Sequence, residues 1–121
     1  MKYIKKIFEI NTSDDISETL YDIFDDIIED KYWSIKVNKE DKCYILKLNC
    51  LYNNWYSVSL LNTIMNNIEH SIKYMRDYYV VIKIENNIYG VDMQVNSYKN
   101  VRNFLVGFGE DDILSIKFME K

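Results

Sequence analysis

The stretch DDISETLYDIFDDIIED, residues 14 to 30, runs directly into KYWSIKV, residues 31 to 37, and this change of pattern decides the fold class. The first segment has apolar residues every three or four positions, which is the spacing of an amphipathic helix with one buried stripe. In the second segment Trp33, Ile35 and Val37 alternate with polar residues, which predicts a strand with one buried face. A helix and a strand therefore follow each other within one short region. The apolar stripe of the helix consists of Ile16, Leu20, Ile23, Phe24, Ile27 and Ile28.

The same patterns predict the remaining elements on both sides of this junction. Before it we expect a first strand over residues 3 to 10. After it we expect a strand over 44 to 50, joined to the preceding strand by a polar turn at 38 to 42, and then a helix over 61 to 75 whose start extends toward Val58. A hairpin over 79 to 95, a short helix that Ser97 caps and Gly107 ends, and a last strand over 114 to 118 complete the chain.

The hairpin over 79 to 95 allows a prediction of register. A two-residue turn at Asn86-Asn87 pairs Glu85 with Ile88, and Ile82 then faces Val91. This register collects apolar residues on one face of the hairpin and polar residues on the other.

Together these elements predict an α+β fold in the order β-α-β-β-α-β-β-α-β. We expect a single domain over residues 1 to 121, with about six strands in a mostly antiparallel or mixed sheet and about three helices, largely on one face. The length suits one domain, and no linker, repeat or low-complexity tract divides it.

Composition points to a cytoplasmic protein. The N-terminal residues lack the apolar run of a signal peptide, and no stretch approaches the roughly 20 apolar residues of a membrane span. Cys43 and Cys50 lie seven positions apart on one predicted strand, so they point to opposite faces and cannot pair, and free thiols suit a reducing compartment. The chain has no proline and no alanine but many Asn, Ile, Lys and Tyr residues, which is typical of an A/T-rich bacterial, phage or viral genome.

The sequence offers no set of residues for catalysis, a cofactor or a metal. His70, the single histidine, lies off the apolar stripe of its predicted helix, and neither cysteine has a base nearby in the sequence. Gly107-Phe108-Gly109 follows a helix rather than a strand and precedes three acidic residues, which would repel a phosphate. The CxxC, HxxxH and EF-hand patterns are absent. We therefore expect a non-catalytic protein with neither cofactor nor metal.

Charge is the most distinctive feature of the chain. Of its 19 acidic residues, eight lie in the predicted helix over 14 to 30, which has no Lys or Arg, although the whole chain is only −4. Like charges four positions apart destabilise a helix by a few tenths of a kcal/mol per pair. Such a stripe suits a basic protein partner, and the alternative is an ordinary solvated face. The candidate contact residues of this helix are Glu18, Asp22, Asp25, Asp26 and Glu29.

A second candidate surface is aromatic. Tyr52, Trp55 and Tyr56 surround Asn53-Asn54 in a predicted loop. Tyrosine and tryptophan dominate binding hot spots, so these rings are candidate partner contacts, and the alternative is that they cap the core from the loop. Direct nucleic-acid binding is disfavoured by the net charge of −4 and by the absence of a basic stripe in the sequence.

In its small size, its acidic helix over 14 to 30, its A/T-rich composition and its lack of a catalytic set, the chain resembles the immunity proteins of bacterial toxin systems, including contact-dependent inhibition. The resemblance lies in the layout and in no specific motif. It implies neutralisation of a cognate toxin, such as a nuclease whose basic active site the acidic helix would cover. A phage inhibitor of a host defence nuclease, such as an anti-CRISPR protein, has the same features, and a homo-oligomeric structural or adaptor domain, for instance a homodimer, is the alternative from another class.

Overall fold

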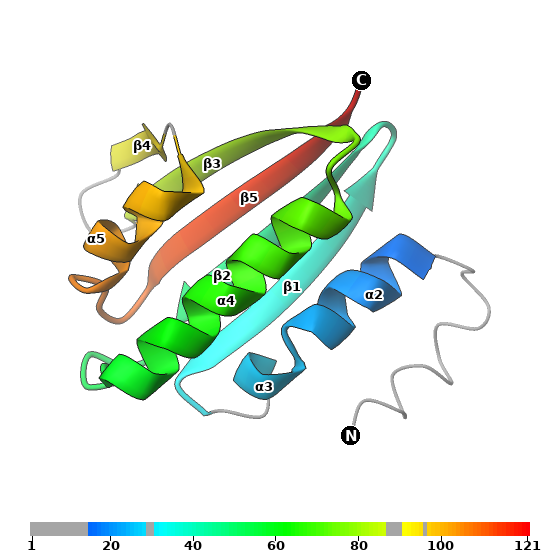
Figure 1. Cartoon of the computed structure of the whole chain (residues 1–121). Coiled ribbons are helices and arrows are strands. Elements are labelled where there is room, and N and C mark those ends of the chain that lie inside the picture. The colour runs from blue at the N-terminus through cyan, green and yellow to red at the C-terminus, as the bar shows by residue number, and fades with distance from the viewer. Residues whose placement is uncertain (1–14, 29–30, 87–90, 96) are drawn as a thin grey trace.

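The computed structural model describes residues 15–28, 31–86, 91–95 and 97–121. In this part of the chain one antiparallel five-stranded sheet carries helices on one face, so the protein is α+β (Figure 1). The strands lie in the order β1-β2-β5-β3-β4. From the N-terminus the elements are α2 (Asp15–Ile23), α3 (Asp25–Ile28), β1 (Trp33–Glu40), β2 (Cys43–Cys50), α4 (Val58–Tyr74), β3 (Tyr78–Asn86), β4 (Val91–Val95), a 3₁₀ turn η1 (Tyr98–Asn100), α5 (Val101–Leu105) and β5 (Asp112–Glu120).

The hairpin of β1 and β2 confirms the predicted pair of strands and extends it. Pairing continues to Glu40 and Cys43, so the turn is only Asp41 and Lys42 rather than the whole polar run from 38 to 42. Along β2, buried and half-buried residues alternate without interruption. One face of this hairpin therefore belongs to the core and the other stays partly open to solvent.

The last strand of the chain lies at the centre of the sheet. β5 pairs with β2 on one side and with β3 on the other, so Ile116 is opposite both Leu46 and Ile82. Leu114, Ile116 and Phe118 are fully buried. Sequence periodicity predicts this strand over 114 to 118, but periodicity carries no information on strand order.

The hairpin of β3 and β4 forms in a register that differs from the prediction. Ile82 pairs with Val95 rather than Val91, and Asn86 pairs with Val91, so the predicted two-residue turn at 86 to 87 is wrong. The partners are displaced by four positions, an even number that leaves every side chain on the same face. Alternation therefore fits both registers equally, and it could not distinguish them.

The helix over 61 to 75 is confirmed with an earlier start. It begins at Val58, after Ser57, whose Oγ accepts a hydrogen bond from the Leu60 amide at 3.1 Å. Leu61, Ile64 and Ile68 are fully buried against the sheet. The short C-terminal helix is also confirmed, because Ser97 caps η1 and both Val101 and Leu105 are buried.

The acidic helix is divided at Phe24 into α2 and α3. The Phe24 amide donates to both Leu20 and Tyr21 carbonyls, and Ile27 bonds back only three residues, to Phe24. These bonds tighten the turn, and the ring of Phe24 is fully buried. Aspartates at 25 and 26 have low helix propensity and add like-charge repulsion, so the backbone departs from a regular helix here. The described part thus has four α-helices, where three were expected, and the strand predicted over 3 to 10 lies outside the described residues.

One edge of the sheet is protected by a tyrosine. β1 is an outer strand of the described five-stranded sheet, and the Val37 amide on the side away from β2 donates to the Tyr21 hydroxyl of α2 at 2.9 Å. Unpaired edge amides invite pairing with other chains. Tyr21 therefore joins the acidic helix to the sheet and also satisfies a donor on its edge.

We expect Tyr21→Phe to lower the free energy of unfolding by about 0.5–1.5 kcal/mol, because the substitution removes this hydrogen bond and leaves the ring in place. Urea unfolding followed by circular dichroism measures the change. Tyr74→Phe is the matched control, since Tyr74 is an exposed tyrosine of α4, and it should leave the stability unchanged. Equal effects of the two substitutions would contradict the role assigned to Tyr21.

Candidate functional site

Three aromatic rings build a rigid wall at the end of the sheet where β1 begins and β2 ends. Trp55 packs edge-on against Trp33, with ring centroids 5.0 Å apart, and Trp33 stacks on Phe108 at 5.9 Å. The Trp55 indole donates its Nε1–H to the Phe108 carbonyl at 2.9 Å. Trp55 is only 2% exposed, so it belongs to the core. Of the two sequence interpretations of Trp55, the structure supports the ring that caps the core rather than a direct partner contact.

The two tyrosines of the same loop lie outside this wall and face solvent. Tyr52 is 48% exposed and Tyr56 is 47% exposed. Tyr56 packs edge-on against Trp55 at 5.5 Å, and Tyr52 packs edge-on against Tyr32 at 5.8 Å. The core ring of Trp55 therefore positions Tyr56, and the half-buried Tyr32 positions Tyr52.

Asn53 ties this loop to the connection between α5 and β5. Its Oδ1 accepts a hydrogen bond from the Glu110 amide at 2.8 Å. A Cβ on Gly109 would lie 2.5 Å from the same oxygen, so glycine is needed for this close approach. The Leu51 amide also donates to the Tyr32 carbonyl, which joins the loop to the start of β1. Sequence reasoning missed Asn53 and Gly109 because their partners are distant in sequence.

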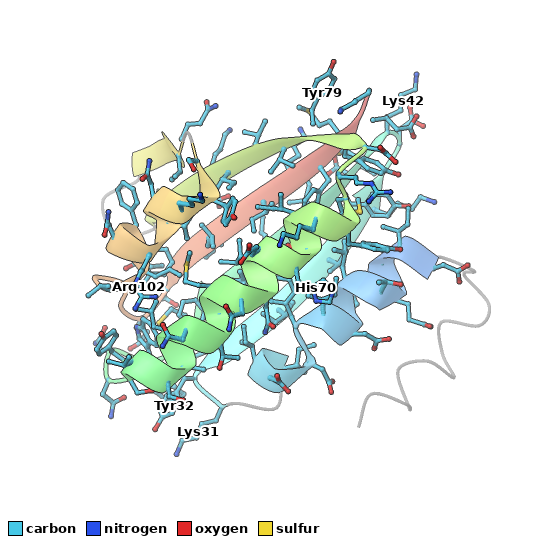
Figure 2. The ribbon with its side chains drawn as sticks, in the orientation of Figure 1. Lys31, Tyr32, Lys42, His70, Tyr79 and Arg102 are labelled. Carbon is cyan, nitrogen blue, oxygen red and sulfur yellow. The ribbon has the colours of Figure 1, made fainter. Side chains whose placement is uncertain are left out.

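An open hollow of about 470 Å³ lies beside these rings, between α3 and the first turns of α4. It brings together the two segments that the sequence nominated separately, since Asp26 of α3 and Tyr56 of the loop both line it. Tyr32 and Lys31 project at this end of the molecule (Figure 2). Among the described residues, the lining consists of Asp26, Tyr32, Asn54, Trp55, Tyr56, Ser57, Ser59, Leu60 and Thr63.

The acidic side chains of α2 and α3 differ in their exposure. Asp15 and Asp26 are exposed, whereas Glu18, Asp22 and Asp25 are half-buried and interact with other groups of the protein. Glu29 lies outside the described residues. The two exposed acids are thus the ones best placed to meet an incoming charge.

A row of lysines crosses the opposite face of the sheet, on which none of the described helices lies. Lys36 pairs with Lys47, Lys47 pairs with Ser115, and Ser115 pairs with Lys83 on its other side. Directly opposed like charges are unfavourable, and Lys47 is partly neutralised by Glu85 at 3.6 Å. The sequence shows no basic stripe, and this row was not expected, because strand pairing brings together lysines that are far apart in sequence. In the described part of the chain, the acidic side chains of α2 and α3 thus lie on the helical side of the sheet and this lysine row lies on the other.

The thiols are poor nucleophiles at neutral pH. Cys50 is fully buried, and burial, together with the carboxylates of Asp112 and Glu110, raises the pKa of Cys50 to about 11. Burial and the hydrogen bond that its Sγ donates to Glu40 raise the pKa of Cys43. Both thiols are free, as their placement on one strand predicts.

The raised pKa of Cys50 predicts a loss of stability at high pH. Below about pH 9 the thiol is protonated in both folded and unfolded chains, so its contribution is fully present. Between about 9 and 11 the unfolded chain ionises first, so stability falls as pH rises. Urea unfolding of wild type and Cys50→Ala should show a stability difference that shrinks over this range. A difference that is constant from pH 7 to pH 11 would contradict the assignment.

The remaining candidates for chemistry do not converge on a site. His70 is exposed on α4, as predicted, and projects away from the sheet (Figure 2). Among the described residues no three His, Cys, Asp or Glu side chains are grouped to hold a metal ion. None of the described helices has the length and apolar character needed to cross a membrane.

Comparisons of this chain with models of protein families, with curated proteins and with solved structures find no match. The candidate site therefore stands on its own geometry: an acidic and aromatic end, named here for Asp26, Tyr52 and Tyr56 and for the hollow beside them. Asp15 begins α2 at the opposite end of the acidic helices, so it extends the acidic surface away from the hollow (Figure 1).

Proposed function

We propose that this protein is a non-catalytic binding protein whose acidic and aromatic end binds a basic protein. The observation that carries the proposal is the meeting of Asp26 and Tyr56 at one hollow. A carboxylate beside exposed tyrosine rings combines long-range attraction of a basic surface with the residue type that dominates binding hot spots. Val58 and Ile28, 58% and 39% exposed, add apolar area.

The separation of charge between the two faces supports the same proposal. The acidic helices cover one face of the sheet, and the row of Lys36, Lys47 and Lys83 lies on the other. A basic partner is attracted to the helical side and repelled from the lysine side. Approach is thus biased toward the candidate site before contact is made, which raises the association rate.

The most specific role that fits is that of an immunity protein, which neutralises a cognate toxin by covering its active site. A nuclease is the expected class of toxin, because enzymes that bind nucleic acid present a basic groove. An acidic surface fills such a groove in place of the substrate. The protein contributes shape and charge to this inhibition and no chemistry of its own.

Co-expression tests this role. The products of the neighbouring reading frames are expressed in bacteria with and without this protein, and survival is scored. We expect one neighbour to be toxic alone and harmless when this protein is present. Purified protein should then inhibit the toxin at a ratio of one to one. The assigned surface would be contradicted if the variant Asp15→Lys/Asp26→Lys/Tyr56→Ala still rescued growth at equal expression. Inhibition of a host defence complex in place of a toxin would favour the anti-CRISPR alternative.

A further inference from the structure

We propose that the hollow between α3 and α4 receives one arginine side chain of the partner. The inference rests on the proposed function, because it names the group that a basic protein would insert at the acidic and aromatic end. A volume of about 470 Å³ is far more than a single water needs, and it lies in the range of ligand pockets. Its lining is largely polar, so an apolar side chain would leave carboxylate, amide and hydroxyl groups unsatisfied.

The charges around the hollow select a cation. Asp26 supplies a carboxylate, and the described lining residues include neither Lys nor Arg. Tyr32 and Tyr56 add aromatic rings, whose faces attract cations, and the buried Trp55 supports them from behind. The protein's own Lys31 already makes such a contact at the rim, where its Nζ lies 5.3 Å from the centre of the Tyr32 ring, so an arginine that binds this ring takes the place of Lys31.

The start of α4 also borders the hollow, and its dipole opposes a cation. This dipole amounts to about half a positive charge, whereas the Asp26 carboxylate carries a full negative one. Ser57 further reduces the opposing effect, because its Oγ accepts from the Leu60 amide and its carbonyl accepts from the Leu61 amide. Lys31 adds a positive charge at the rim, but it is exposed and its side chain can leave the Tyr32 ring, so Asp26 remains the charged group of the described lining and favours a positive ligand.

Guanidinium fits this lining better than ammonium. It presents five N–H donors in a plane and stacks on aromatic faces, whereas lysine offers a compact and strongly hydrated charge. Asp26, Asn54 and Ser59 offer carboxylate, amide and hydroxyl oxygens around the same hollow. Trp55 is held by its bond to Phe108, so one wall is formed before the ligand arrives, which lowers the cost of binding.

The test uses the full-length protein and N-acetyl-arginine methylamide as the probe, followed by two-dimensional NMR. We expect saturable shifts of the Trp55 indole and of the amides of Ser57 and Ser59, with a Kd in the low millimolar range (about 1–10 mM) for so small a ligand. The citrulline analogue, which has the same shape without the charge, should bind at least about fivefold more weakly. Asp26→Asn should weaken arginine binding by a similar factor, and the matched control Asp41→Asn should not.

Shifts without saturation, or equal binding of arginine and citrulline analogues, would overturn the inference. The proposed function fails separately, when the basic partner binds equally well to the variant that lacks Asp15, Asp26 and Tyr56. If the partner requires this surface but the hollow does not bind the arginine probe, only the assignment of arginine is contradicted.

Discussion

Trp55→Ala is expected to lower the free energy of unfolding by about 3–5 kcal/mol, because it removes a large ring from the core. The ring is 2% exposed, packs on Trp33 and donates to the Phe108 carbonyl. Its loss leaves a cavity under the 51–57 loop and an unpartnered carbonyl. The midpoint of thermal unfolding should fall by more than about 10 °C, measured by circular dichroism or calorimetry.

The neighbouring Tyr56→Ala is the control for this prediction. Tyr56 is half exposed, so its removal should cost less than about 1 kcal/mol of stability while it weakens partner binding. Trp55 thus acts on binding through the loop that it supports, and Tyr56 acts by contact. Normal stability of Trp55→Ala with a faster dissociation from the partner would reverse these two roles.

Charge reversal at the two exposed acids, Asp15→Lys/Asp26→Lys, should slow association with the basic partner by about 10- to 100-fold at low ionic strength. Electrostatic steering acts mainly on the association rate, so the dissociation rate should change less. The effect should shrink as salt rises, because exposed charges are screened beyond about 8–10 Å. Stopped-flow or surface-plasmon measurements at several salt concentrations give both rates.

Asp41→Lys/Asp77→Lys is the matched control, since it changes the net charge equally. Both residues are exposed in turns, one between β1 and β2 and the other between α4 and β3, at the end of the molecule away from the loop over 51 to 57 (Figure 1). Their reversal should change the association rate by less than about threefold. Equal slowing by both double variants would mean that net charge alone governs the encounter.

Local sequence patterns predicted the elements in which the spacing of apolar residues alone identifies a helix or a strand. The buried stripe of Leu61, Ile64 and Ile68 marks α4, and alternation marks β2 and β5. The acidic helix was also expected, but its break at Phe24 was missed because its apolar spacing continues without interruption. The prediction of the β3–β4 register was wrong for a related reason. A shift by four positions keeps every residue on its face, so the apolar pattern is the same in both registers.

The candidate site was predicted only as two separate parts. Sequence nominated Asp26 and Tyr56, but it could not show that α3 and the loop over 51 to 57 border one hollow. Burial of Trp55 depends on contacts with Trp33 and Phe108, far away in the chain, so its role could not be assigned from the loop alone. The lysine row requires the strand order, which no local pattern contains.

The most direct test of the central claim is a tagged pull-down from the source organism, with the two neighbouring reading frames co-expressed and the captured proteins identified by mass spectrometry. Wild type and Asp41→Lys/Asp77→Lys should each capture one basic protein in stoichiometric amount, and rising salt should release it. Asp15→Lys/Asp26→Lys/Tyr56→Ala should capture much less. Recovery of only the protein itself at a defined oligomeric mass, or equal capture by all three forms, would contradict the claim that the acidic and aromatic end binds a basic protein.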